Sequence, residues 1–235
     1  LELLKQKGIG IQEISIKKQE RFLIEIYIEN MQRTKIDAIE KILTDVLKEK
    51  IVLNDEACLG NRLNFLSDDK YVMAVGTADS IKSKSDVSGD SVLNIRLKDG
   101  KYLLAISDGM GSGRAAKESS SNALKMLENL LFAGFQKEES LELINTSLIN
   151  QNKEVFATLD IAIVDLYKGN IEFIKSGACP TYIKKGDKVQ ILKANSLPAG
   201  IVPNANLQVY DKDIDSNEIM LMCSDGILDS NVEYK

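Results

Sequence analysis

Short apolar runs separated by turn residues fill most of the chain after residue 70. Asp99-Gly100, Gly169-Asn170 and Gly186-Asp187 each stand between two such runs, and these dipeptides favour two-residue β-hairpin turns. The pattern therefore predicts mainly antiparallel β-structure. The expected strands cover residues 71–77, 91–97, 102–107, 158–166, 170–176, 181–185, 188–193, 207–212 and 218–224.

Two segments within this region instead repeat apolar residues every three or four positions, which is the spacing of an amphipathic helix. They cover residues 114–133 and 138–153. Because antiparallel hairpins accompany a consecutive pair of helices, we predict an α+β sandwich with the sheets inside and the helices outside.

The N-terminal part of the chain carries a different pattern. Residues 10–16 and 22–28 alternate well enough to form two strands, and residues 35–49 repeat apolar side chains at helical spacing. This part lacks the acid-glycine motifs described below. We therefore predict a small N-terminal α/β regulatory segment over residues 1–60, ahead of a main domain over residues 71–235.

Charge and composition narrow the class of protein. The net charge is −5 and no basic run is interleaved with aromatic residues, so we expect no nucleic-acid partner. No apolar stretch approaches the roughly 20 residues that span a bilayer, so we expect this part of the chain to be soluble. The three cysteines are widely spaced and form no C-x-x-C pair, which favours a reducing compartment over a disulfide or zinc framework.

Histidine is absent from all 235 residues. This excludes Ser-His-Asp and Cys-His catalysis, a histidine phosphoenzyme, and the commonest ligand of transition metals. Any chemistry must therefore use carboxylates, amines, guanidinium groups, hydroxyls or a metal ion held by oxygen atoms.

The tripeptide Ser-Asp-Gly occurs twice, each time directly after an apolar run, and contributes Asp108 and Asp225. A carboxylate at the end of a buried strand is costly unless a cation or hydrogen-bond donors meet it. Asp90 follows Gly89 in a similar setting. Three such carboxylates in a chain without histidine point to a metal ion bound by oxygen ligands.

A two-residue turn at Asp99-Gly100 would place Asp90 and Asp108 diagonally across the open end of one hairpin. Strict alternation would then send their side chains to opposite faces, unless the glycines beside them let both turn inward. Two carboxylates this close repel each other unless one is protonated or a cation lies between them. We therefore expect a divalent cation there.

The segment from Ser107 to Arg114 allows two other interpretations. It can be a plain glycine-rich turn between a strand and a helix. Residues 111–116 also match the G-x-G-x-x-A form of the dinucleotide fingerprint. That fingerprint needs an acid about 20 residues on, at the end of a second parallel strand. Glu128 stands inside a predicted helix instead, so nucleotide binding is the weakest interpretation.

Several short motifs follow one another along the main domain. They are Val87-Ser88-Gly89-Asp90-Ser91, Ser107-Asp108-Gly109-Met110-Gly111-Ser112-Gly113, Thr158-Leu159-Asp160, Ser176-Gly177-Ala178, Leu197-Pro198-Ala199-Gly200-Ile201 and Ser224-Asp225-Gly226-Ile227. In this order they resemble the metal-dependent serine/threonine protein phosphatases (the PPM family), most closely the stage II sporulation protein E type. The resemblance covers residues 71–235 and, more loosely, residues 1–60.

The resemblance implies an α-β-β-α sandwich of two antiparallel sheets flanked by helices, with two Mn²⁺ or Mg²⁺ ions. Asp108 would bridge both ions. Asp90 and the Gly109 carbonyl would serve one ion, and Asp225 the other. Water activated by the ions would attack the phosphorus of a phosphoserine, so no side-chain base is needed. Arg114, which opens the following helix, is a candidate contact for the substrate phosphate.

The resemblance also implies a biological setting. The substrate would be a phosphorylated anti-anti-sigma factor, whose dephosphorylation activates a sporulation sigma factor. We expect a cytoplasmic location, a membrane segment only outside this part of the chain, and a possible homodimer through the helices. Because the Gly109 carbonyl is close in sequence to the helix over residues 114–133, a shift of that helix is expected to change metal affinity.

Three further features bear on the site. The family carries another metal-binding acidic pair before its last strand, and no such element follows Asp225 before Lys235. One ion is therefore expected to be under-ligated, and a non-catalytic, phosphatase-like binding module stays as the alternative function. Asp160 is either a supporting group of the site or a plain outward-facing residue, and Cys223 is expected in the core.

Overall fold

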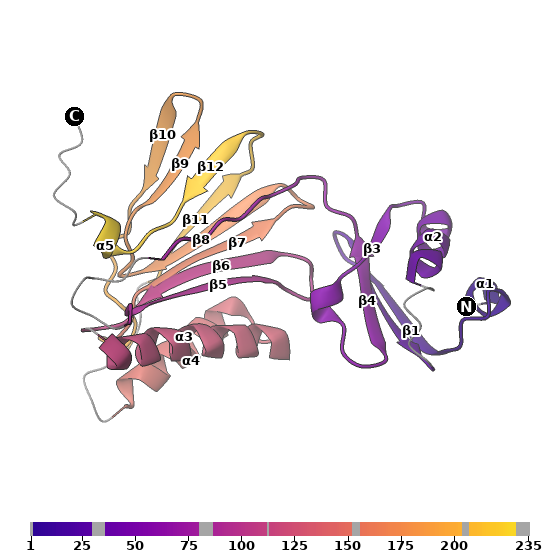
Figure 1. Ribbon diagram of the computed structural model, residues 1–235, viewed down its shortest axis with the longest axis horizontal. Coiled ribbons are helices and arrows are strands. Elements are labelled where there is room, and N and C mark those ends of the chain that lie inside the picture. The colour runs from indigo at the N-terminus through magenta and orange to yellow at the C-terminus, as the bar shows by residue number, and fades with distance from the viewer. Residues whose placement is uncertain are drawn as a thin grey trace. The chain divides into compact units, whose positions relative to one another are not determined.

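The computed structural model describes residues 2–29, 36–79, 87–111, 113–151, 156–203 and 207–228 (Figure 1). The chain divides into two compact units. The first unit comprises Leu1–Met73, Ile95–Tyr102 and Asp165–Gly169, and the second comprises the remainder. The tips of two β-hairpins thus belong to the first unit. Among the described residues, no helix is both long enough and apolar enough to cross a membrane.

The first unit is built on a four-stranded antiparallel sheet with the order β1-β2-β4-β3. Alternate residues of β2, namely Ile24, Ile26 and Ile28, are buried in one core cluster with Ile39 and Leu43 of helix α2. The two strands and the helix predicted here from the sequence are confirmed. The elements are α1 (Glu2–Gln6), β1 (Ile11–Lys18), β2 (Phe22–Ile28), α2 (Ile36–Leu47), β3 (Ile51–Leu53), the 3₁₀ helix η2 (Asp55–Ala57) and β4 (Arg62–Ser67).

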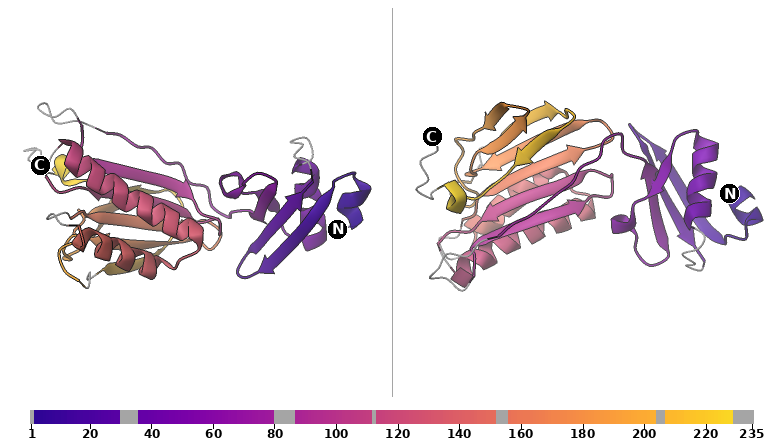
Figure 2. Two further views of the ribbon diagram at one scale, coloured as in Figure 1. Left: turned by 90° about the horizontal axis from the view of Figure 1, so that it is seen from below. Right: turned by 45° about the horizontal axis from the view of Figure 1, so that its top comes forward.

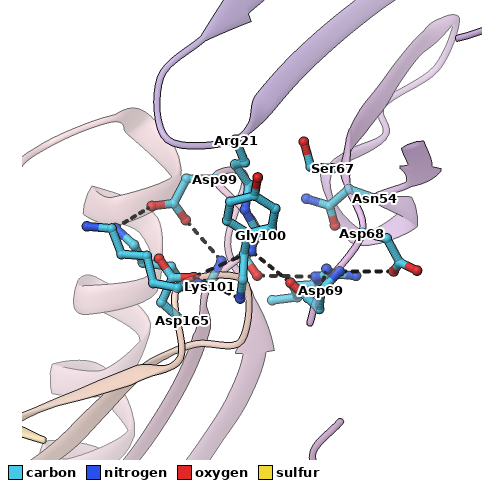
Figure 3. Close-up of polar contacts among 12 residues, drawn as sticks. Arg21, Asn54, Ser67, Asp68, Asp69, Asp99, Gly100, Lys101 and Asp165 are labelled. Atoms are coloured by element: carbon cyan, nitrogen blue, oxygen red, sulfur yellow. Dashed lines mark hydrogen bonds and ion pairs between the residues drawn. The ribbon is translucent and has the colours of Figure 1, made fainter. Parts of the chain in front are cut away.

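A buried arginine organises the polar contacts of the first unit (Figure 3). Arg21 Nη2 lies 2.7 Å from Asp69 Oδ1 and 3.5 Å from Asp165 Oδ1, and the guanidinium lies over the ring of Tyr167. A Cβ on Gly100 would lie 2.2 Å from Arg21 Nη1, and Gly100 has a φ of +84°. Glycine is therefore required at this turn for both its conformation and its lack of a side chain.

The second unit contains a five-stranded sheet with the order β11-β8-β7-β6-β5 and a three-stranded sheet with the order β10-β9-β12. Helices α3 and α4 lie along one face of the five-stranded sheet, and the three-stranded sheet lies on the other side (Figures 1 and 2). The elements are β5 (Asp90–Arg96), β6 (Tyr102–Asp108), α3 (Gly113–Ala133), α4 (Lys137–Ile149), β7 (Leu159–Asp165), β8 (Asn170–Ser176), β9 (Thr181–Lys185), β10 (Lys188–Leu192), β11 (Gln208–Asp213), β12 (Glu218–Leu221) and α5 (Asp225–Leu228).

The predicted α+β class, with antiparallel sheets and accompanying helices, is confirmed. The Gly186-Asp187 hairpin is also confirmed, because Lys185 pairs with Lys188 across a two-residue turn. The strand predicted over residues 71–77 is wrong, since this segment is irregular and Val72 is 99% exposed. Its residues have high β-propensity, but that propensity reflects packing on a half-buried pleated surface, which Val72 lacks.

Candidate metal centre

The turn between β5 and β6 decides how Asp90 and Asp108 face each other. The N–H of Leu97 donates to the Lys101 carbonyl at 2.7 Å, and the N–H of Gly100 donates to the Leu97 carbonyl at 2.9 Å. This is a three-residue loop with a left-handed glycine, so the predicted two-residue turn is wrong.

The longer loop shifts the register by one residue relative to the prediction. With residue 97 facing residue 101, the first residue of β5 faces the last residue of β6, in agreement with the equal lengths of the two strands. Asp90 then lies directly opposite Asp108. Directly opposed residues of an antiparallel pair project from the same face, so neither carboxylate has to turn away from its strand.

Asp90 also connects this hairpin to the second Ser-Asp-Gly motif. Ser224 Oγ donates to Asp90 Oδ2 at 2.7 Å, although the two residues are 134 positions apart. From the other side, Lys117 Nζ of α3 donates to the main-chain carbonyl of Asp90. The start of β5 is therefore held between α3 and the segment that carries Asp225.

Asp108 is fixed through its main chain by Thr158. Its N–H donates to Thr158 Oγ1 at 2.9 Å, and its carbonyl accepts the Thr158 N–H at 2.9 Å. A Cβ on Gly89 would lie 3.6 Å from Asp108 Oδ1 and 3.7 Å from the Gly109 carbonyl oxygen. The Asp108 carboxylate oxygen and the Gly109 carbonyl oxygen therefore both lie next to Gly89.

Gly109 lies directly against the backbone of α3. A Cβ at this position would lie 1.9 Å from the carbonyl oxygen of Ala116 and 2.7 Å from its carbonyl carbon. Only glycine permits this approach. The close packing fixes the position of the Gly109 main chain relative to the helix.

A single cavity of about 510 Å³ gathers the predicted metal ligands, because Asp90, Asp108, Gly109 and Asp225 all line it. Arg114 is exposed in the first turn of α3, next to Gly113, which does line the cavity. Carboxylate and carbonyl oxygens are the donors that Mg²⁺ and Mn²⁺ prefer, so this donor set fits the expected ions. Within the described parts of the chain, no three Asp, Glu, His or Cys residues form a ready metal-binding group.

The sequence analysis missed a buried cation that is paired with Asp160. Lys175 Nζ lies 2.5 Å from Asp160 Oδ1, and the two side chains are 0% and 3% exposed. The alternative of Asp160 as an outward-facing residue is therefore wrong. Burial raises the pKa of Asp160, and the charge of Lys175 opposes that rise. Cys223 is buried, as predicted.

A second cavity of about 90 Å³ lies beside Asp108 and Asp225, both of which line it as well. Its other lining residues include Asp160, Cys179 and Cys223. Burial raises the pKa of the Cys179 thiol to about 11, so this cysteine is not a reactive thiolate at neutral pH.

The sequence did not predict the pairing of Asp160 with Lys175, because the two-residue turn predicted at Gly169-Asn170 is also wrong. The N–H of Gly169 donates to the carbonyl of Asp165, so the loop after β7 is longer than a two-residue turn at Gly169-Asn170. The bounds of β7 and β8 set residue 165 opposite residue 170, and hence residue 160 opposite residue 175. The available signal was an acid and a base, Asp160 and Lys175, each directly next to an apolar residue of its strand, but the wrong register separated them.

Comparisons with known proteins identify relatives of this chain. The family model described as "Stage II sporulation protein E (SpoIIE)" matches residues 98–234. Stage II sporulation protein E of Priestia megaterium is 36% identical over 239 residues, covering 97% of this chain and 41% of that protein. The protein of the same name from Bacillus subtilis (strain 168) is 32% identical over 240 residues, covering 97% and 29%. The chain spans less than half the length of these relatives.

Two solved structures are also similar to this chain. The PP2C phosphatase domain of SpoIIE from Bacillus subtilis, solved with a fragment of its regulatory domain, matches with a TM-score of 0.68 and 32% identity, covering 99% of this chain and 71% of that chain. RsbX in complex with magnesium matches with a TM-score of 0.53 at 15% identity, covering 94% and 81%, and therefore shows a shared fold alone.

Proposed function

Because the chain belongs to the stage II sporulation protein E family, we propose that it is a metal-dependent phosphatase acting on phosphoserine in a protein substrate. One observation carries the proposal. Three carboxylates and one main-chain carbonyl from distant parts of the sequence, Asp90, Asp108, Gly109 and Asp225, line a single cavity. Such a donor set suits two hard divalent ions, Mn²⁺ or Mg²⁺.

When bound, the two ions would supply an activated water and would neutralise charge on the phosphoryl oxygens. The residues of the chain hold this arrangement in place. Asp108 would help to hold both ions. Asp90, oriented by the Ser224 hydroxyl, and the Gly109 carbonyl would serve one ion, and Asp225 would serve the other. No side-chain base is required, in agreement with a chain that contains no histidine.

Arg114 is proposed as a contact for the substrate phosphate. It is exposed at the start of α3, one residue after Gly113 at the cavity wall. A guanidinium group there can form paired hydrogen bonds to phosphate oxygens. Its exposure leaves the side chain free to reach an incoming phosphoprotein.

The substrate itself is a finer proposal that rests on membership of a sporulation family. We propose a phosphorylated anti-anti-sigma factor, whose dephosphorylation leads to activation of a sporulation sigma factor. In the same proposal this part of the protein is cytoplasmic and pairs as a homodimer through its helices, and a membrane segment lies elsewhere in the whole protein.

The alternative function is a non-catalytic phosphatase-like module that binds a partner. It is favoured by one observation, since the described residues contain no ready group of three metal-binding side chains. Under this alternative the carboxylates would stabilise a binding surface and would not depend on a metal.

Turnover of a phosphoserine protein with and without Mn²⁺ separates the two functions. We expect the wild-type chain, and a version extended beyond Lys235, to need Mn²⁺. We expect Asp108→Asn to lose at least about 100-fold in turnover, because one ligand would no longer bridge both ions. Lys50→Gln, which changes an exposed ion pair of the first unit, is the matched control and should retain activity. Activity that survives both metal removal and Asp108→Asn would reject the two-metal proposal.

A further inference from the structure

Lys175 is a charged residue in the interior of the five-stranded sheet. Its ammonium pairs with the Asp160 carboxylate, and Thr181 Oγ1 donates to the second carboxylate oxygen at 3.3 Å. An apolar pair of similar volume often stabilises a core as well as, or better than, a buried ion pair. Stability alone therefore gives no reason for a lysine at this place.

The same ammonium makes a second contact, beyond the end of β8. Lys175 Nζ donates to the carbonyl of Cys179 at 2.8 Å. The segment from Gly177 to Cys179 is held at its other end as well, because the N–H of Gly177 donates to Ser196 Oγ at 3.2 Å. Lys175 thus ties this segment to Asp160 on the neighbouring strand.

The segment held by Lys175 forms one wall of the smaller cavity. Gly177, Ala178 and Cys179 line that cavity together with Asp108 and Asp225. The same two carboxylates also line the larger cavity. The segment therefore faces the same small cavity as two of the proposed metal ligands.

From this geometry we propose that Lys175 is a positioning residue of the metal centre, which fixes residues 177–179 so that they hold Asp108 and Asp225 in place. The inference rests on the proposed function. Groups that support metal ligands from behind commonly change metal affinity when they are removed. Lys175 has this role without contacting a metal or the substrate.

The test uses the double variant Asp160→Val/Lys175→Met, which removes both buried charges and leaves neither partner unpaired. We expect a folded protein whose Mn²⁺ affinity, measured by isothermal titration calorimetry, is about tenfold weaker. We also expect faster hydrogen exchange at the amides of residues 177–179 without metal, since the Cys179 carbonyl loses its donor. The matched control is Lys137→Met/Glu172→Val, an ion pair between α4 and β8 that lines neither cavity, and it should leave both readouts unchanged.

A conservative variant tests whether Mn²⁺ binding depends on the position of Lys175 or on the charge of Asp160. Asp160→Asn keeps an oxygen acceptor for Lys175 but leaves a buried ammonium without its counter-charge, so we expect a loss of stability in thermal unfolding. In the folded protein Lys175 still donates to the Cys179 carbonyl, and we expect Mn²⁺ affinity within about threefold of wild type. If the double variant does not fold, Lys175→Gln replaces it. Because the glutamine side chain is one atom shorter, its N–H cannot take the position of Lys175 Nζ beside the Cys179 carbonyl, and the same weakening is expected.

Wild-type Mn²⁺ affinity together with wild-type exchange at residues 177–179 in the folded lysine variant would overturn the positioning role. A loss of affinity in Asp160→Asn equal to that of the lysine variant would overturn it too, because charge would then be the cause. Failure of the wild-type chain to bind Mn²⁺ at all would instead reject the proposed function, and this inference with it.

Discussion

The two Ser-Asp-Gly motifs look alike in sequence, but the structure predicts that a methyl group added to the glycine lowers stability and metal binding in the first motif and leaves them unchanged in the second. In Gly109→Ala, the new Cβ would lie 1.9 Å from the Ala116 carbonyl oxygen, whereas real Cβ atoms essentially never come within 3.0 Å of such an atom. Either α3 or the Gly109 main chain must therefore move by about 1 Å. Overpacking of this kind costs about 1–3 kcal/mol.

The same displacement should impair the metal centre. Gly109 is proposed to present its carbonyl to an ion, and a misplacement of about 1 Å at a reacting centre can lower the rate about 100-fold. Gly226→Ala is the matched control, because a Cβ on Gly226 would have no atom of the described residues within 4 Å, apart from its chain neighbours and its own helix. Gly226 also follows Asp225 as Gly109 follows Asp108, so the two variants differ chiefly in packing.

Three measurements on each variant check this reasoning, namely thermal unfolding, Mn²⁺ titration calorimetry and turnover of a phosphoserine protein. For Gly109→Ala we expect a melting temperature lower by about 3 °C for each kcal/mol lost, weaker Mn²⁺ binding and about 100-fold lower turnover. Gly226→Ala should remain close to wild type in stability and Mn²⁺ binding. A Gly109→Ala protein with wild-type stability and metal affinity would refute the argument.

Two further predictions concern the first unit. Gly100→Ala places a Cβ 2.2 Å from Arg21 Nη1 at a φ of +84°, and in thermal unfolding it should lose about 1 kcal/mol of backbone strain together with about 1–3 kcal/mol of overpacking. In the described part of the chain, a Cβ on Gly60 (φ +57°) would have no atom within 4 Å besides its chain neighbours. Gly60→Ala should therefore lose only the roughly 1 kcal/mol of backbone strain, and equal losses would contradict the steric argument. Burial tends to raise the pKa of Glu49, but hydrogen bonds from neighbouring side chains outweigh it and lower the pKa from 4.5 to about 2. Because the folded pKa is the lower one, this stabilisation is present above the unfolded pKa and is lost as the pH falls from 4.5 through about 2. The stability advantage of wild type over Glu49→Gln in urea unfolding should vanish across that range, and an advantage independent of pH would count against the assignment.

Much of the local structure follows from patterns within a few residues. Helices α2 and α3 begin and end within two residues of their predicted bounds, because their apolar residues recur at the helical period. The hairpin at Gly186-Asp187 follows from turn chemistry alone. The segment over residues 71–77 shows the limit of such patterns, since its strand-like residues pair with no strand among the residues that the structure describes.

The site was predictable in its chemistry and less so in its geometry. The carboxylates Asp90, Asp108 and Asp225 stand out because glycines accompany them and no histidine is present. Lys175 escaped notice because its partner lies on another strand, at a distance in sequence that depends on the length of the loop between them. A pattern along one strand cannot specify its neighbour across the sheet.

The sequence by itself determined the donors available for chemistry, the order of the motifs and the family to which they belong. The tertiary structure decided which of these residues meet. In a β-hairpin, one extra residue in the turn moves every facing pair by one position and exchanges the two faces of the sheet. That single step sets Asp90 opposite Asp108. After β7, a loop longer than the predicted two-residue turn sets Lys175 opposite Asp160. The approach of Gly109 to Ala116 likewise arises only when α3 packs against the sheet.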